Sequence, residues 1–170
     1  KRQGKRIKES RNLKTGEYSK ATKRVGLESF KAGKKGLRSV VTHKDKGGIY
    51  AWKVLSKTLA YAASLVPEIT DNIVNVDLAM KNGFLWKKGP FEILDDLGPA
   101  WFSSKISEDG MEVPNLLEKV ANGKFYDLKD SNPTFFGTDG KYSKLKNPEG
   151  YLTAADVKRG NSPIFRNPSA

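Results

Sequence analysis

The sequence predicts a mainly α-helical domain with a basic, irregular N-terminal arm and a small β-hairpin near its C-terminal end. Apolar residues recur at helical spacing through the middle of the chain, prolines and glycines bound these segments, and an Asp-Gly turn flanked by aromatic residues follows them. The 170 residues suit one domain with tails. We expect a basic arm or connector over residues 1–46, the helical domain with its hairpin over 47–146, and a linker toward a following domain over 147–170.

The arm carries the whole charge imbalance of the chain. Residues 1–48 hold 16 Lys and Arg against 4 Asp and Glu, whereas residues 49–170 hold 15 of each kind. The arm has few large apolar residues, so we expect it to lie over a surface, with a weak hairpin around Gly16 and a short strand or extended connector over residues 37–41. Such a charge suits nucleic acid, an anionic membrane surface or an acidic neighbouring domain, and composition does not choose among them.

The helical domain begins with a long amphipathic segment. Apolar residues follow helical spacing over residues 49–66, and Pro67 ends the helix. Thr70 or Asp71 is the expected N-cap of the next helix, and Gly83 is the expected left-handed residue at its C-terminal end. These signals predict two helices joined by a short turn.

Prolines then mark three shorter helices. Pro90, Pro99 and Pro114 each stand where a helix is expected to begin, because proline at the first helical position sacrifices no hydrogen bond. Gly98 closes the first of the three. Farther on, Asp139-Gly140 between aromatic residues predicts a β-hairpin, and residues 153–159 suit one or two helical turns.

The residues that commonly carry catalysis are sparse. The chain has no cysteine, its one histidine is His43, and its glycines match neither the dinucleotide nor the P-loop pattern. We therefore predict no catalytic residue, no cofactor-binding residue and no metal site within the chain. No apolar run approaches the ~20 residues that span a bilayer, and no apolar segment follows the basic start of the sequence, so we expect no secretory signal there. A reducing, cytoplasmic location is expected.

One segment carries a specific combination of residues. Residues 59–98 read LAYAASLVPEITDNIVNVDLAMKNGFLWKKGPFEILDDLG and combine Asp77 with a Gly-Pro-Phe-Glu start at Gly89 and an Asp-x-x-Gly at Asp95. This combination resembles the C-terminal helical domain of 3-hydroxyacyl-CoA dehydrogenases over about forty residues. The flanking segments resemble, more loosely, the second such domain of multifunctional fatty-acid β-oxidation proteins, which also contain an enoyl-CoA hydratase domain.

The resemblance implies a parent enzyme that oxidises (3S)-hydroxyacyl-CoA to 3-oxoacyl-CoA with NAD. The family's substrate-site Asn falls on or near Trp52, so this copy is expected to be a non-catalytic structural domain, paired with the first helical domain as one subunit pairs with another. NAD is then bound by a separate domain, and the partners are the NAD-binding, first helical and hydratase domains and the acyl-CoA substrate.

The resemblance also points to individual residues. Gly89, Pro90 and Phe91 are the candidates for the substrate surround. As large aromatic side chains, Trp52 and Trp86 are the candidates for an interface; the alternative is that they fill the core of this domain, which is the favoured interpretation for Trp52. The alternative function, drawn from composition, is a basic module that binds nucleic acid or another anion.

Overall fold

A computed structural model describes residues 7–21, 26–129 and 132–145. The chain divides into two compact units, Lys1–Ile49 and Tyr50–Ala170. Among the described residues, no helix is both long enough and apolar enough to cross a membrane. The predicted linker over 147–170 and the predicted helical turns over 153–159 lie outside the described residues.

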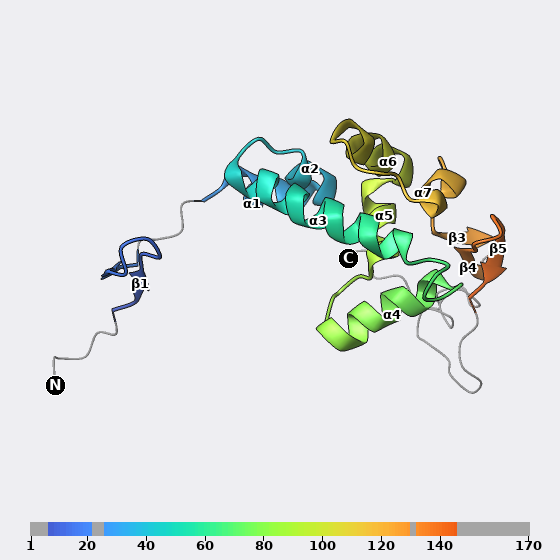
Figure 1. Ribbon diagram of the computed structural model, residues 1–170, viewed down its shortest axis with the longest axis horizontal. Helices are drawn as coiled ribbons and strands as arrows, with labels where there is room; N and C mark the ends of the chain where they lie inside the picture. The colour runs from blue at the N-terminus through green and yellow to red at the C-terminus, as the bar shows by residue number, and fades with distance from the viewer. Residues whose placement is uncertain (1–6, 22–25, 130–131, 146–170) are drawn as a thin grey trace, which may run out of the picture. The chain divides into compact units, whose positions relative to one another are not determined.

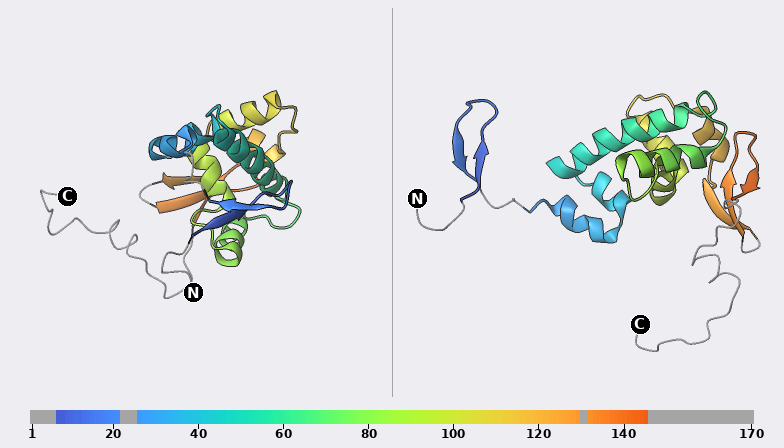
Figure 2. Two further views of the ribbon diagram at one scale, coloured as in Figure 1. Left: turned by 90° about the vertical axis from the view of Figure 1, so that its left-hand side faces the viewer. Right: turned by 90° about the horizontal axis from the view of Figure 1, so that it is seen from below.

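The described part of the first unit begins with a hairpin. Strands β1 (Glu9–Arg11) and β2 (Tyr18–Lys20) pair antiparallel, as Figure 2 shows at the N-terminal end of the ribbon. The Asn12 side chain accepts a hydrogen bond from the Lys14 backbone N–H at 2.9 Å, and Gly16 takes a φ of 75°. Glycine adopts this left-handed conformation without steric cost, so the turn forms where the sequence predicts it.

Residues 28–41 of the arm are mostly helical, so the expectation of an irregular arm is wrong for this stretch. Helix α1 (Glu28–Ala32), the 3₁₀-helix η1 (Gly33–Lys35) and helix α2 (Leu37–Val41) follow one another. The expected strand or connector over 37–41 is therefore also wrong. The helix satisfies its backbone locally, for example through the Thr42 N–H bonded to the Arg38 carbonyl at 3.1 Å, while Val41 is buried.

Asp45 joins this helical pair to the start of helix α3 (Lys46–Ser64). One oxygen of its carboxylate accepts from the Ser29 backbone N–H at 2.9 Å, and the other accepts from the Gly48 N–H at 2.9 Å. These hydrogen bonds, with that from Ser29 foremost, lower the pKa of Asp45 below its usual value. The carboxylate thus caps the longest described helix.

In the second unit, α3 buries its small and branched residues and ends before Pro67, as predicted. Leu59 and Ala63 are fully buried. Helix α4 (Ile73–Phe84) follows, and its N-cap is Asn72, whose side chain accepts from the Val74 N–H at 2.9 Å. The predicted caps Thr70 and Asp71 are therefore wrong.

The C-terminal end of α4 also differs from the prediction. Gly83 lies inside the helix, and Leu85 is the left-handed residue that closes it, with a φ of 56°. The sequence signal at Gly83 is wrong by two residues because the helix continues until the chain must turn toward α5. A branched side chain in this conformation costs on the order of 1 kcal/mol.

Three short helices follow, and the prolines mark their starts. Helices α5 (Pro90–Leu97) and α6 (Pro99–Glu108) begin with proline, and Pro114 is the N-cap of α7 (Asn115–Val120). Their inward side chains are fully or almost fully buried: Phe91, Leu94, Leu97, Phe102, Ile106, Leu116 and Leu117. Figure 1 shows α5, α6 and α7 following one another within this unit.

A three-stranded antiparallel sheet follows in the described part of the unit. Strands β3 (Tyr126–Lys129), β4 (Asn132–Phe136) and β5 (Tyr142–Lys144) pair in the order β3-β4-β5. The β4–β5 pair confirms the predicted hairpin, with Gly140 at a φ of 78° in its turn. Strand β3 is a third strand, which the Asp139-Gly140 turn signal does not predict. Ring contacts connect sheet and helices, with Phe125 4.9 Å from Phe91 and 6.4 Å from Phe136 between centroids.

Candidate functional site

The Asp77 carboxylate lies at the junction of three elements of the second unit. Only 2% of the residue is exposed. It accepts hydrogen bonds from the backbone N–H of Phe91 at 2.8 Å and of Glu92 at 3.3 Å, and from the Tyr126 hydroxyl at 2.8 Å. The first N–H groups of a helix have no partner within the helix, so a carboxylate of α4 caps α5 from outside. We call Asp77, Gly89, Glu92, Asp95 and Tyr126 the carboxylate junction.

Gly89 makes the close approach of α4 and α5 possible. A Cβ atom placed on it would stand 2.2 Å from the Asp77 Cγ. Glu92 completes the helix start, since its Oε2 accepts from the Gly89 N–H at 2.8 Å and its Oε1 from the Lys81 ammonium at 2.6 Å. The family-like Gly-Pro-Phe-Glu motif is thus a helix start built around a buried carboxylate.

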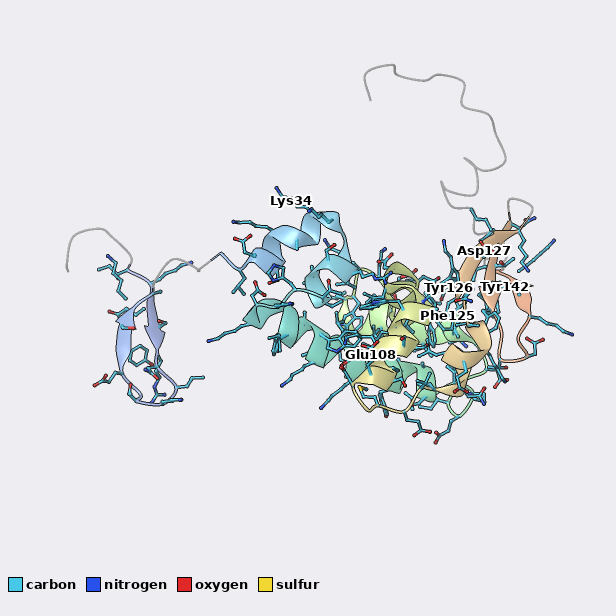
Figure 3. All side chains as sticks on the ribbon, turned by 90° about the horizontal axis from the view of Figure 1, so that it is seen from above. Lys34, Glu108, Phe125, Tyr126, Asp127 and Tyr142 are labelled. Carbon is cyan, nitrogen blue, oxygen red and sulfur yellow. The ribbon has the colours of Figure 1, made fainter. Side chains whose placement is uncertain are left out.

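Asp95, near the other end of α5, also accepts hydrogen bonds from two backbone N–H groups. Its two oxygens accept from the backbone N–H groups of Phe125 at 2.7 Å and Tyr126 at 2.8 Å. These hydrogen bonds fix the start of β3, where Figure 3 labels both residues. The Asp77 and Asp95 side chains therefore hold α4, α5 and the sheet together.

Burial dominates the electrostatics of the junction. It raises the pKa of Asp77 to about 6, and the N–H of Phe91 and the hydroxyl of Tyr126 partly offset that rise. Burial also raises the pKa of Asp95 and, together with the negative charge of Asp77, the pKa of Tyr126. Tyr126 therefore stays protonated at neutral pH, and its hydroxyl donates a hydrogen bond to Asp77. The oxygens of Asp77 and Asp95 face donors of the protein itself, an arrangement that stabilises structure.

This geometry predicts a pH dependence of stability. The pKa of Asp77 rises from 3.8 to about 6 on folding, so the part of its stabilisation that depends on protonation is fully present below about pH 4 and is lost as the pH increases through 6. Asp77→Asn removes the titration. We subtract the free energy of unfolding of D77N from that of the unchanged chain. This difference should be about 2 kcal/mol more positive at pH 4.5 than at pH 7.5. Urea unfolding at both pH values measures this. Equal differences would contradict the raised pKa.

The structure places the predicted substrate-surround residues in the interior. Gly89, Pro90 and Phe91 are all buried at the start of α5, with Pro90 and Phe91 among the most completely buried residues of the described chain. Their role in a substrate surround stays a prediction. Any such contribution would come from the position of the α5 start, since the side chains face the core.

The predicted interface residues have different surroundings. Trp52, on α3, is half-buried and packs edge-on against Trp101 at 5.7 Å and Phe102 at 5.8 Å, and its indole N–H donates to the Asp109 carboxylate. Trp86 is half-buried in the loop after α4. Beside it in the chain, Phe84 and Leu85 are 71% and 87% exposed. We call Phe84, Leu85 and Trp86 the α4 tip, and their interface role stays a prediction.

Sequence reasoning missed the central place of Tyr126. Its hydroxyl reaches an aspartate 49 residues away along the chain, and no local pattern encodes such a pairing. A signal existed for Asp77 itself, because it lies four residues after the buried Ile73 on the inward face of a helix. A carboxylate at an inward helical position needs donors.

Metal chemistry has little support in the part of the chain that the structure describes. No group of three or more His, Cys, Asp and Glu side chains gathers there. His43 contacts Asp45, with its Nδ1 atom 3.4 Å from the carboxylate.

Sequence comparisons identify relatives. The chain is 31% identical over 137 residues to a probable 3-hydroxyacyl-CoA dehydrogenase of Bacillus subtilis, which covers 79% of this chain and 17% of that protein. It is 34% identical over 135 residues to putative fatty acid oxidation complex trifunctional enzymes of Rickettsia felis and Rickettsia prowazekii, a match to 75% of this chain and 18% of each. No family model and no solved structure matches the chain.

The chain thus spans less than a fifth of the length of these relatives. The matches agree with the resemblance carried by Asp77, the Gly-Pro-Phe-Glu start and Asp95. This chain is homologous to one segment of the 3-hydroxyacyl-CoA dehydrogenases and of the fatty acid oxidation trifunctional enzymes.

Proposed function

We propose that this chain is a non-catalytic helical domain of an NAD-dependent 3-hydroxyacyl-CoA dehydrogenase of fatty-acid β-oxidation, the second of its two helical repeats. The whole protein would oxidise (3S)-hydroxyacyl-CoA to 3-oxoacyl-CoA. The carboxylate junction carries the proposal, because the residues of the family-like motif bind one another and the backbone. Asp77 and Asp95 together accept five hydrogen bonds from this chain's own donors.

NAD does not fit the residues of this chain. Within the described ranges, no Gly-rich turn links a strand to a helix in the arrangement that cradles a dinucleotide phosphate. We propose that NAD binds a different domain of the parent and that catalysis takes place there. This chain then contributes shape and rigidity, and it has the neighbouring domains as its partners.

The α4 tip supports a structural role. Two large apolar side chains in succession are mostly exposed, and the left-handed Leu85 holds them at the end of a helix. Leu78, which is 46% exposed, lies on the same helix as Phe84. Exposed apolar clusters of this kind mark protein interfaces. We propose that the tip packs against a neighbouring domain of the parent.

Leu85→Asp tests that proposal. In the parent divided into two polypeptides, this chain and the remainder, the substitution should weaken their association at least about tenfold, because it puts an unpaired charge in an apolar interface. Titration calorimetry measures the affinity. Leu128→Asp, at a residue 62% exposed on β3, is the matched control and should have little effect. Unchanged affinity in L85D would refute the interface.

The non-catalytic role has a direct test as well. The isolated chain, incubated with 3-hydroxybutyryl-CoA and NAD, should form no NADH, as followed by absorbance. NADH formation at a rate comparable with that of the parent would show that the chain carries the chemistry itself.

A second candidate function, anion binding, rests on the first unit. The observation that favours it is the concentration of 16 Lys and Arg against 4 Asp and Glu in residues 1–48. This role is compatible with the first, since the two concern different units.

A further inference from the structure

The described part of the first unit presents more cationic than anionic side chains to solvent. Between residues 26 and 49, the sequence has six Lys and Arg and two carboxylates, Glu28 and Asp45. Asp45 is occupied by the Ser29 and Gly48 N–H groups, and Glu28 pairs with Lys31 at 2.8 Å. Lys34 and Lys35 are exposed and form no ion pair within the described ranges.

An apolar side chain lies among these cations. Phe30 on α1 is 82% exposed, although phenylalanine is usually a buried core residue. Lys34 and Lys35 follow Phe30 by four and five residues, in the 3₁₀-helix η1 that comes directly after α1. Figure 3 shows the Lys34 side chain extending away from the ribbon. The Phe30 ring is thus exposed on a short helical stretch that also carries Lys31, Lys34 and Lys35.

The hairpin repeats this combination. Leu13, in the β1–β2 turn, is 96% exposed and stands beside Lys14 in the chain. Arg11 and Lys8 add cationic charge on β1 and its approach. An aliphatic side chain at the end of a turn, with cations next to it, repeats the chemistry of the Phe30 surface on a different element.

We propose that the first unit binds an anionic phospholipid surface, with Phe30 and Leu13 entering the interface and the lysines contacting the headgroups. Surface binding of this kind combines apolar side chains that reach the acyl boundary with Lys and Arg at the headgroups. This proposal does not depend on the proposed enzyme function.

The side chains favour lipid over nucleic acid. Single-stranded nucleic acid binds aromatic faces on which successive bases stack. The Arg11 guanidinium lies 6.0 Å from the centroid of the Tyr18 ring, on one of its faces, and Leu13 offers no stacking face. Phe30 and Tyr18 are the exposed aromatic rings among the described residues of the unit, and they lie on separate elements, a helix and a strand, so they do not form a row on which successive bases stack. An aliphatic group exposed at a turn gains free energy from a hydrocarbon boundary and very little from a base.

The test uses the full 170-residue chain and vesicles. Co-sedimentation with vesicles of equal parts phosphatidylcholine and phosphatidylglycerol should exceed that with phosphatidylcholine alone and should weaken as salt is added. The double variant K34E/K35E should lower the partition coefficient about 30-fold or more, at roughly fivefold for each lysine removed from the surface. F30S and L13S should each lower it several-fold at constant charge.

Lys53 and Lys57, both exposed on α3, provide the matched control. K53E/K57E changes the net charge equally and should retain most of the binding, while circular dichroism should show that every variant is folded. The proposal would be overturned by equal binding to neutral and anionic vesicles, or by equal losses in the two double variants. Tighter binding to single-stranded RNA than to anionic vesicles, at the same salt concentration, would assign the surface to nucleic acid and would also overturn it.

Discussion

Asp77→Ala should lower the free energy of unfolding by about 3 kcal/mol at neutral pH. The substitution leaves the Phe91 N–H, the Glu92 N–H and the Tyr126 hydroxyl without the carboxylate that they now share. Each unsatisfied buried donor costs about 1–3 kcal/mol, and relief from burying a charge offsets part of the sum. Urea unfolding followed by tryptophan fluorescence gives the value.

Asp71→Ala provides the comparison for this substitution. Asp71 is exposed in the turn before α4, so its loss should change the free energy of unfolding by less than about 0.5 kcal/mol. Phe125 and Tyr126 amides should also exchange hydrogen faster in D77A, because the Tyr126 anchor at the start of β3 is lost. A D77A protein as stable as the parent would mean that the junction is not a major source of stability.

Gly89→Ala should destabilise the chain by a similar amount, about 3 kcal/mol. The φ of Gly89 is −75°, which alanine adopts readily, so the cost is steric. The added Cβ would stand 2.2 Å from the Cγ of Asp77, which three donors hold in place. Either α5 moves away from α4 or Asp77 leaves its donors, and overpacking of this kind costs about 1–3 kcal/mol before hydrogen bonds are lost.

Gly83→Ala is the matched control and should have the opposite sign. Gly83 lies within α4, and a Cβ there would meet nothing within 4 Å. Alanine favours the helix over glycine by about 0.5–1 kcal/mol, so G83A should raise the midpoint of thermal unfolding. Thermal melts followed by circular dichroism compare the two variants. If G89A and G83A changed stability equally, the close approach at Gly89 would be refuted.

The end of α4 shows a limit of prediction from the sequence. Gly83 comes at the end of the apolar helical pattern and is the residue type that most often closes a helix, yet Leu85 is the left-handed residue at the end of α4. A local pattern reports what each residue adopts cheaply. The position at which α4 ends depends on where the chain must turn to reach α5. The packing of the α5 start against Asp77 offsets the conformational strain of the left-handed Leu85.

The arm shows the opposite error. Val40 and Val41 suit a strand by propensity, but they lie in α2, where Val41 is buried and the backbone is satisfied within the helix. A strand there would need a partner strand, and the described strands of the unit pair with each other. Tertiary context overrides a propensity of well under 1 kcal/mol per residue.

By itself, the sequence determined the mainly helical class, the starts of α5, α6 and α7, and the hairpin turn at Asp139-Gly140. Proline restricts its own φ, glycine tolerates positive φ, and the spacing of apolar residues reports the period of the element, so all three signals are local. It also determined the family resemblance. The tertiary structure alone decided that Asp77 binds Tyr126 and that Asp95 binds the start of β3, because those partners lie 49 and 30 residues away. Only the folded chain brings such groups together, and their burial gives the motif its structural meaning.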